Sequence, residues 1–366
     1  MAVALEAVLN GTGSPLLPLP GGDLRQSELL QTALRAGEEI DDDVALVVST
    51  SGTTGTPKGA MLTAPALIAS ASATADRLGG PGTWLLALPA YHVAGLQVVI
   101  RSVLAGTTPV ELDVSAGFDV AVLPAAVAAM GSGRRYASLV AAQLAKALQD
   151  PAAAEALAAL DTVLLGGGPA PQPVLDGAAA AGISVVRTYG SSETAGGCVY
   201  DGVPLPGVQV RIEADTRIVL GGPTLAKGYR NVPAENPFAE PGWFRTDDAG
   251  SVEDGVLRVL GRIDEAISTG GLTVLPQPVE AVLSTHPAIA DCAIFGVSDD
   301  RLGQRVVAAV VLAPGAAAPT VASLREHVTQ QLDATAAPRE LHVVDELPRR
   351  GIGKLDRRAL VARFSR

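Results

Sequence analysis

The stretch TSGTTGTPKG, residues 50–59, governs how the remainder of the chain is interpreted. It follows the apolar run ALVVS (45–49), which is typical of a buried strand. Its glycine, serine and threonine residues can direct backbone amides and hydroxyls at phosphate oxygens, and Lys58 adds a positive charge. Pro57 precedes the lysine and Gly59 follows it, which departs from the Walker pattern GxxxxGK[ST]. The stretch therefore predicts a phosphate-binding loop outside the usual P-loop fold.

Length, charge and composition favour a small-molecule partner. The 366 residues suffice for about two domains, and the net charge of −11 opposes binding to nucleic acid or anionic lipid. The apolar runs end before membrane-spanning length, and no basic segment precedes an apolar N-terminus. We therefore expect no membrane insertion, no secretory signal and a cytoplasmic location. Cys198 and Cys292 form no CxxC pair, and we expect both to be buried.

The pattern of apolar runs predicts an α/β fold with two domains. Short apolar runs alternate with Ala-rich helical stretches from residue 40 to about residue 190, which predicts mostly parallel sheets with helices. Shorter alternating runs between 205 and 262 predict antiparallel hairpins, a small β region that closes the large domain. Mixed helix and strand patterns follow Gly261. We expect a large N-terminal domain over residues 1–263 and a small α+β domain over residues 264–366.

Several further segments occur in the order found in one known superfamily. They are YHVAGL (91–96), GGGP (166–169), YGSSET (189–194), WFRTDDAG (243–250), GRIDE (261–265) and PRRGIGK (348–354). With residues 50–59, they make the chain resemble the adenylate-forming superfamily of acyl-CoA synthetases, peptide-synthetase adenylation domains and luciferases. The resemblance covers nearly everything from residue 45 onward. It implies that ATP adenylates a carboxylic acid, and that the acyl group then passes to a thiol such as coenzyme A.

The resemblance also implies which residues bind ATP. The expected nucleotide-binding residues are Thr50, Ser51, Gly52, Thr53, Thr54, Gly55, Gly167, Gly168, Pro169, Tyr189, Gly190, Asp248 and Arg262. The Gly167 turn would lie along the adenine, where glycine permits close approach of the backbone. Asp248 and Arg262 would contact the ribose. The sequence reads Thr246-Asp247-Asp248 where the family commonly has TGD, so the choice between the two aspartates stays open.

Catalysis of this reaction must rest on positioning and charge neutralisation, because an anion attacks a phosphorus atom already surrounded by negative oxygens. By resemblance, Glu193 holds Mg²⁺ and Thr194 touches the phosphates. Lys354 would enter the active site for adenylation and leave it when the small domain, mobile in this family, rotates at the hinge residue Asp264. The expected catalytic residues are Lys354, Lys58, Glu193, Thr194 and His92.

One arginine points to the acid that is activated. Arg101 lies in the apolar helical stretch GLQVVIRSVLAG (95–106), and if it is buried it needs an anion such as a substrate carboxylate. Alternatively, it reaches solvent at the helix end. This stretch and YASLVAAQL (136–144) are similar to o-succinylbenzoyl-CoA synthetases of menaquinone biosynthesis, in their compact actinobacterial form, where the matching arginine recognises the ring carboxylate. Weaker candidates for the acid pocket are Ser138, Gly196 and Gly197, with His92 at its edge.

Other functions stay open at this point. The chain could be another acyl- or aryl-CoA ligase, or a stand-alone adenylation domain that loads a carrier protein, although no aspartate for an amino-acid ammonium group is identifiable. A nucleotide-binding protein that has lost catalysis would be expected to lack Glu193 or Lys354, yet both are present. We expect ATP, Mg²⁺ and coenzyme A as cofactor and co-substrates. A homodimer is expected from the resemblance alone.

Overall fold

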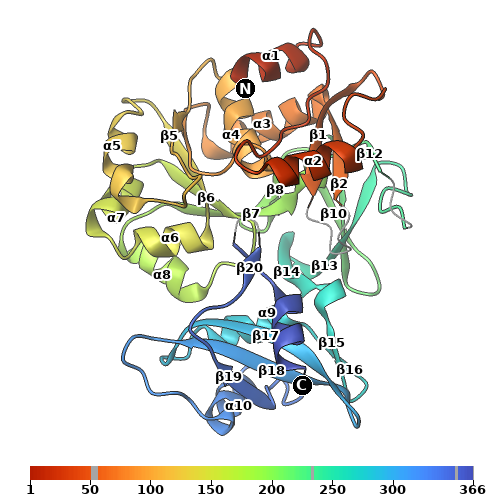
Figure 1. Cartoon of the computed structure of the whole chain (residues 1–366). Helices are drawn as coiled ribbons and strands as arrows, with labels where there is room; N and C mark the ends of the chain where they lie inside the picture. Colours follow the sequence, from red (N-terminus) through yellow and green to blue (C-terminus); the bar gives the residue numbers. More distant parts are fainter. Residues whose placement is uncertain (51–56, 232–234, 351–352, 366) are drawn as a thin grey trace.

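Two lobes of unequal size make up the structure, and the chain passes from the large lobe to the small one after residue 262 (Figure 1). The computed structural model describes residues 1–50, 57–231, 235–350 and 353–365. Within these ranges, no helix has both the length and the apolar character needed to cross a membrane. Cys198 and Cys292 are both buried, as expected.

A seven-stranded sheet forms the centre of the large lobe, with strand order β4-β3-β5-β6-β7-β8-β9. The strands from β4 to β7 are parallel and the last two are antiparallel, which confirms the predicted mostly parallel sheet. The strands are β3 (Thr83–Leu86), β4 (Val110–Glu111), β5 (Arg135–Val140), β6 (Thr162–Gly166), β7 (Val185–Ser191), β8 (Gly196–Tyr200) and β9 (Val203–Pro204). The helices between them are α4 (Val93–Leu104), η1 (Val120–Val122), α5 (Leu123–Ala128), α6 (Ala141–Ala147), α7 (Pro151–Ala158) and α8 (Gln172–Ala180).

Alternating side chains of this sheet fill two separate cores. Leu164 of β6 belongs to the core that also contains residues of α1 (Ala2–Leu9), α3 (Ala64–Leu78) and α4. Its neighbours Val163 and Leu165 point to the other face and pack with residues of α5, α6, α7 and α8. Because both faces are covered, the strand reads as the continuous apolar run TVLLG rather than as an alternating pattern.

The first strand departs from the sequence-based expectation. β1 (Val44–Thr50) was expected to open a βα unit of the parallel sheet, but it pairs antiparallel with β2 (Lys58–Thr63) in a separate sheet with β12 (Gly228–Tyr229). Helix α3 begins only after β2, where the Thr63 side chain accepts a hydrogen bond from the Ala66 amide. Thr50 and Lys58 are opposite each other in this pair, so the two ends of the glycine-rich stretch lie side by side. Helix α2 (Leu24–Ala33) precedes β1.

The predicted hairpins form a four-stranded antiparallel sheet with order β10-β11-β13-β14. Its strands are β10 (Gln209–Ile212), β11 (Arg217–Gly221), β13 (Trp243–Glu253) and β14 (Val256–Arg262). A single 3₁₀ turn, η3 (Ile263–Glu265), connects β14 to the small lobe. The last strand of the large lobe therefore leads directly into the connection between the lobes.

The small lobe is a five-stranded sheet with helices on both faces. Its strands are β15 (Ile267–Thr269), β16 (Leu272–Val274), β17 (Ile289–Asp299), β18 (Gly303–Leu312) and β19 (Glu340–Val343). One core includes side chains of α9 (Pro276–Leu283) and α10 (Val321–Thr329), and the other includes side chains of α11 (Arg357–Phe364). The hairpin of β20 (Arg349–Arg350) and β21 (Lys354–Leu355) extends from this lobe toward the large one (Figure 1).

Candidate active site

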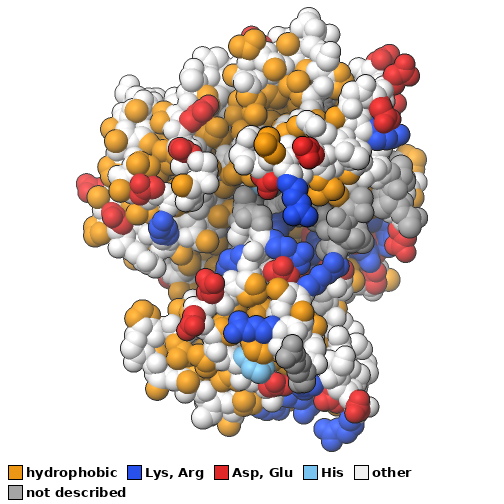
Figure 2. Space-filling model, in the orientation of Figure 1, with side chains coloured by type: hydrophobic (Ala, Val, Ile, Leu, Met, Phe, Trp, Pro, Cys, Tyr) orange, Lys and Arg blue, Asp and Glu red, His pale blue; other side chains and the backbone are white. Residues whose placement is uncertain are grey.

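An open cleft between the lobes collects most of the residues that the sequence predicted as functional. The described residues that line it are Thr50, Lys58, His92, Arg101, Ser138, Gly167, Gly168, Pro169, Tyr189, Gly190, Glu193, Gly196, Gly197, Asp248, Arg262, Asp264 and Lys354. Ser51, Gly52, Thr53, Thr54 and Gly55 lie outside the described residues. Figure 2 shows lysine and arginine side chains gathered where the lobes meet, although the chain as a whole is acidic. This local positive charge suits anionic substrates.

Glu193 lies in the short turn η2 (Ser192–Thr194) between β7 and β8, and it is only 7% exposed. The Tyr229 hydroxyl donates a hydrogen bond of 2.6 Å to its Oε1 atom. Burial, and then the charge of Glu193, raise the pKa of Tyr229, so the phenol keeps its proton and remains a donor. The Lys58 ammonium lies 5.4 Å from the centre of the Tyr229 ring. A carboxylate, a phenol and a lysine from three separate segments thus form one cluster.

The donor set at Glu193 fits magnesium better than a metal that needs several protein ligands. The described part of the chain contains no group of three or more His, Cys, Asp or Glu residues that could hold a metal ion. Magnesium typically takes one or two protein carboxylates and completes its shell with phosphate oxygens and water. Because the Tyr229 hydrogen bond engages only Oε1, the second oxygen of Glu193 is the one that would bind the ion.

Thr194 does not face the cleft. Its side chain is fully buried, and its hydroxyl donates to the Gly196 carbonyl over 2.7 Å and accepts a hydrogen bond from the Ser191 amide. The predicted contact between Thr194 and phosphate is therefore not made by this geometry, because the hydroxyl is used to hold the turn. Ser191 and Ser192 line the cleft instead, and the buried Ser191 Oγ has no hydrogen-bond partner within the described chain.

The backbone geometry at this turn requires glycine at position 190. Gly190 has φ of +156°, and a Cβ atom there would lie 2.2 Å from the Gly196 carbonyl oxygen. Only glycine permits this approach of β7 to β8, which turns Glu193 toward the cleft. Gly167, which directly follows β6, has φ of +83° and begins the turn predicted to lie along adenine.

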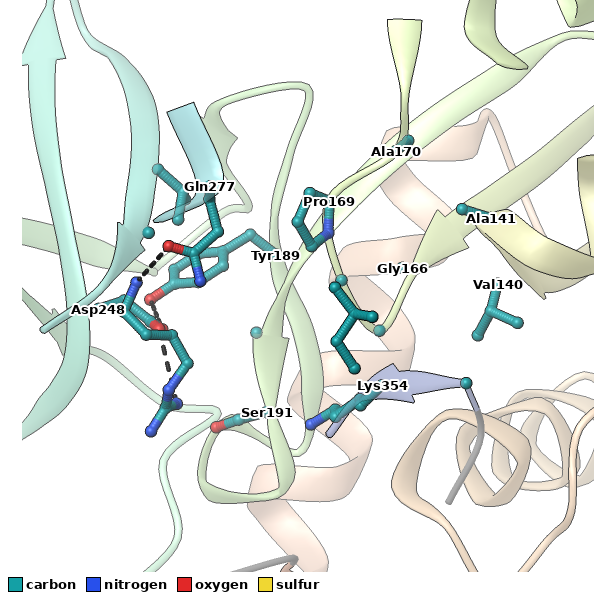
Figure 3. Close-up of a pocket in the computed structure, with 18 of the residues that line it drawn as sticks. Val140, Ala141, Gly166, Pro169, Ala170, Tyr189, Ser191, Asp248, Gln277 and Lys354 are labelled. Carbon is teal, nitrogen blue, oxygen red and sulfur yellow. Dashed lines mark hydrogen bonds and ion pairs between the residues drawn. The ribbon is translucent and has the colours of Figure 1, made fainter. Parts of the chain in front are cut away.

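Asp248, on β13, has the geometry expected of a ribose-binding carboxylate. Its Oδ2 atom accepts a hydrogen bond of 2.8 Å from the Tyr189 hydroxyl (Figure 3). Arg262 lies opposite Asp248 on β14, with 3.6 Å between Nη1 and Oδ1. Burial raises the pKa of Asp248, and the hydrogen bond from Tyr189 opposes that rise. The Asp248 side chain is 20% exposed and that of Asp247 is 59% exposed. The structure therefore favours Asp248 as the residue preorganised within the cleft.

Arg262 also holds Asp264, the predicted hinge residue. Its Nε and Nη2 atoms donate hydrogen bonds of 2.8 and 2.9 Å to the two carboxylate oxygens of Asp264. Burial lowers the pKa of Arg262, but the hydrogen bonds and charge of Asp264, with the neighbouring aspartates, outweigh burial and raise it. The first acidic residue of η3 is thus bound to the last residue of β14.

Lys354 and His92 reach the same region of the cleft from different lobes. Figure 3 shows the Lys354 side chain extending toward Ser191. His92 directly precedes α4 and is half-buried. Burial, followed by the positive charge of Lys354, lowers the pKa of His92. His92 is therefore neutral at neutral pH, and Lys354 contributes the positive charge.

Arg101, on α4, is 7% exposed, so the alternative that it reaches solvent is wrong. Its Nη2 atom lies 3.4 Å from the Tyr200 hydroxyl, and its guanidinium group lies 4.9 Å from the centre of the Trp84 ring. Its Nε atom is buried without a hydrogen-bond partner within the described residues. Burial lowers the pKa of Arg101, and the interaction with Tyr200 opposes that fall. A buried arginine of this kind is suited to bind an anion that enters the cleft.

Three aromatic residues of this site were not predicted from the sequence. Tyr229 holds Glu193, while Tyr200 and Trp84 hold Arg101. None of the three belongs to a sequence motif, and each is brought to its partner only when the chain folds. Ser191 and Ser192 could have been singled out, because they stand in the YGSSET segment beside Glu193.

Comparison with known proteins identifies related sequences. The model of the AMP-binding enzyme family matches residues 15–230, and that of the AMP-binding enzyme C-terminal domain matches residues 278–354. A probable 2-succinylbenzoate–CoA ligase of Mycobacterium tuberculosis is 69% identical, over 99% of this chain and 94% of its own length. A 2-succinylbenzoate–CoA ligase of Geobacillus is 36% identical, over 87% of this chain and 69% of its own length.

Solved structures show the same architecture. The o-succinylbenzoate CoA synthetase of Bacillus subtilis, in complex with an acyl-adenylate intermediate, superimposes with a TM-score of 0.77 and 29% identity over 98% of this chain and 81% of its own. The same synthetase in complex with ATP and magnesium ion gives a TM-score of 0.75, with 29% identity over 97% of this chain and 81% of its own.

Proposed function

The chain belongs to the AMP-binding enzyme family, and from that premise we propose that it is an ATP-dependent ligase that joins 2-succinylbenzoate to coenzyme A. The products of this reaction are the CoA thioester, AMP and pyrophosphate. Relatives named for this activity match nearly the whole chain, and a structural relative binds the corresponding acyl-adenylate. The names of these relatives support a role in menaquinone biosynthesis.

The proposed substrate is based on the buried Arg101. 2-Succinylbenzoate is a dicarboxylate, in which the succinyl carboxylate is activated and the ring carboxylate remains. Arg101 lines the cleft, is buried, and has neutral partners, the Tyr200 hydroxyl and the Trp84 ring, where a protein carboxylate would ordinarily stand. A substrate carboxylate that pairs with it would form a charge-assisted hydrogen bond in a desolvated site. Ser138, Gly196 and Gly197 line the same cleft and complete the acid pocket.

In the first step, an oxygen of the succinyl carboxylate attacks the α-phosphorus of ATP, and the bond from that phosphorus to the leaving pyrophosphate breaks. Lys58 and Lys354 supply positive charge near the phosphates, which is worth most where water is excluded. Glu193 would hold magnesium, which neutralises phosphate charge when bound. Asp248 and Arg262 bind the ribose, and the turn of Gly167, Gly168 and Pro169 lies along the adenine.

In the second step, the thiol of coenzyme A attacks the acyl carbonyl, and AMP leaves with the bonding electrons of the acyl–oxygen bond. Residues 1–263 form the adenylation domain in this proposal, and residues 264–366 form a mobile domain that rotates at Asp264 and withdraws Lys354. Neutral His92 stands at the edge of the acid pocket and can accept a hydrogen bond from the thiol. We also propose a cytoplasmic location, which the need for ATP and coenzyme A supports, and a homodimer, which light scattering would check.

Product analysis tests the proposal. The purified protein is incubated with ATP, magnesium, coenzyme A and 2-succinylbenzoate, and AMP and the thioester are followed by mass spectrometry. Formation of both supports the ligase. A carrier protein in place of coenzyme A, and other aryl or acyl acids in place of 2-succinylbenzoate, test the two alternatives. Thioester from another acid, with none from 2-succinylbenzoate, would retain the ligase and refute the substrate.

A further inference from the structure

Two consecutive acidic residues of the connection between the lobes are held by arginines of different lobes. Asp264 is bound by Arg262 of the large lobe. Glu265, the next residue, accepts a hydrogen bond of 2.6 Å from Nη1 of Arg357, which is the first residue of α11 in the small lobe. If both pairs persist when the lobes move, the backbone rotation is confined between Asp264 and Glu265.

Arg357 is fully engaged within the small lobe as well. Its Nη2 atom lies 2.7 Å from both carboxylate oxygens of Glu280 on α9, and its Nε atom donates to the Ile294 carbonyl of β17 over 3.1 Å. The side chains of Arg357, Glu265 and Glu280 are only 13%, 24% and 12% exposed. A planar guanidinium group in this position fixes the end of the connection against both α9 and β17.

The same residue is joined to the hairpin that carries Lys354. Arg357 lies three positions after Lys354, and the intervening Asp356 caps α11 by accepting a hydrogen bond from the Ala359 amide. Asp356 also accepts a hydrogen bond of 2.6 Å from Arg350 on the opposite strand of the hairpin. A continuous set of contacts therefore runs from Glu265 through Arg357 and Asp356 to the base of the Lys354 hairpin.

We propose that Arg357 is a positioning residue for adenylation, which sets the location of Lys354 relative to the connection between the lobes. This inference rests on the proposed function, in which Lys354 acts on the phosphates. Without the guanidinium group, Glu265 and Glu280 would face each other as like charges in a partly buried site. Of the described contacts that hold Glu265, only the hydrogen bond of 2.6 Å from the Gln277 amide would then remain. Burial already raises the pKa of Glu280, and the charge of Arg357 opposes that rise. Lys354 would then reach the cleft without a fixed orientation.

The test measures the two half-reactions separately in Arg357→Gln, with Arg363→Gln as control. Arg363 lies on the same helix and its described cationic contact is with Phe364 alone. Acyl-adenylate formation from 2-succinylbenzoate and ATP is timed without coenzyme A, and thioester formation is timed from synthetic acyl-adenylate. Displacement of a catalytic group should slow adenylation on the order of 10- to 100-fold. Thioester formation should change by less than about threefold, because Lys354 is withdrawn from that step.

A double variant separates positioning from general damage to the fold. If Arg357 acts through Lys354, Arg357→Gln should slow adenylation no further in a Lys354→Ala background. Equal slowing of both half-reactions, or a further loss in that background, would overturn the inference. Should Arg357→Gln fail to fold, Glu265→Gln carries the test, because it keeps the Glu280 contact, and it should show the same pattern more weakly. A wild-type protein that makes no acyl-adenylate would refute the proposed function as well.

Discussion

Tyr229 donates its hydroxyl hydrogen to Oε1 of Glu193 across 2.6 Å, and this contact joins β12 to the turn between β7 and β8. The carboxylate is thereby oriented with one oxygen engaged and the other left for a cation. In Tyr229→Phe, the ring and its contact with Lys58 are kept, but the orientation of Glu193 is lost. Removal of a residue that orients a metal ligand typically changes the metal affinity 10- to 100-fold.

We therefore expect Tyr229→Phe to raise the dissociation constant of Mn²⁺ in the presence of ATP by about tenfold. Mn²⁺ serves as a magnetic probe for Mg²⁺, and electron paramagnetic resonance reports the free ion directly. Tyr91→Phe is the matched control, because Tyr91 lines the cleft but its ring packs against His92. An unchanged dissociation constant in Tyr229→Phe would show that this hydrogen bond does not orient a metal ligand.

The two adjacent aspartates should differ in their effect on ATP. Asp248→Asn removes a preorganised acceptor that Tyr189 and Arg262 hold in place, and should raise KM for ATP by about one to two orders of magnitude. Asp247→Asn alters a mostly exposed side chain and should change KM for ATP by less than about threefold. Steady-state kinetics at saturating acid and coenzyme A compare the two. The opposite ranking would assign the ribose contact to Asp247.

Removal of the Lys354 charge should raise the pKa of His92. Burial is the main cause of its lowered pKa and persists in Lys354→Gln, while repulsion from the ammonium group disappears. Nuclear magnetic resonance titration of the 4 histidines resolves this shift. In the wild type, the unfolded chain takes up the proton first, so the His92 contribution to stability is present above its usual pKa of 6.5 and is lost as pH falls toward the folded value. An unchanged pKa of His92 in Lys354→Gln would show that Lys354 does not lie near His92 in solution.

The close approach of β7 and β8 should make Gly190 intolerant of a side chain. Its Cβ atom would lie 2.2 Å from the Gly196 carbonyl oxygen, which requires the strands to separate. We expect Gly190→Ala to lower the free energy of unfolding by about 2 kcal/mol or more, measured by urea denaturation. Gly133→Ala is the control, because a Cβ atom there meets nothing within 4 Å. Equal stability of both variants would contradict the geometry at the Glu193 turn.

The sequence predicted the order of the functional segments better than their spatial partners. TSGTTGTPKG and YGSSET identified the cleft because several chemically suited residues stand together in each. Apolar periodicity could not show that β1 pairs with β2 instead of joining the parallel sheet, because a buried strand looks alike in either pairing. The role of Thr194 could not be predicted either, because the sequence does not distinguish a hydroxyl that holds a turn from one that binds phosphate.

The contacts of Arg101 also could not be predicted from the sequence. Its burial could not be decided from composition, and both Tyr200 and Trp84 are distant from it in sequence. Only the folded chain shows that the guanidinium group is desolvated beside neutral partners. This combination is the physical basis for proposing a dicarboxylic substrate.

The contribution of Arg101 to selectivity for the ring carboxylate can be measured with two substrates. We would compare kcat/KM for 2-succinylbenzoate with that for 4-oxo-4-phenylbutanoate, which lacks the ring carboxylate, in the wild type and in Arg101→Gln. The wild type should prefer the dicarboxylate by about 100-fold, which corresponds to about 3 kcal/mol for a charged hydrogen bond, and the variant should lose most of that preference. A preference that persists undiminished in Arg101→Gln would contradict the assignment of Arg101 as the residue that binds the ring carboxylate.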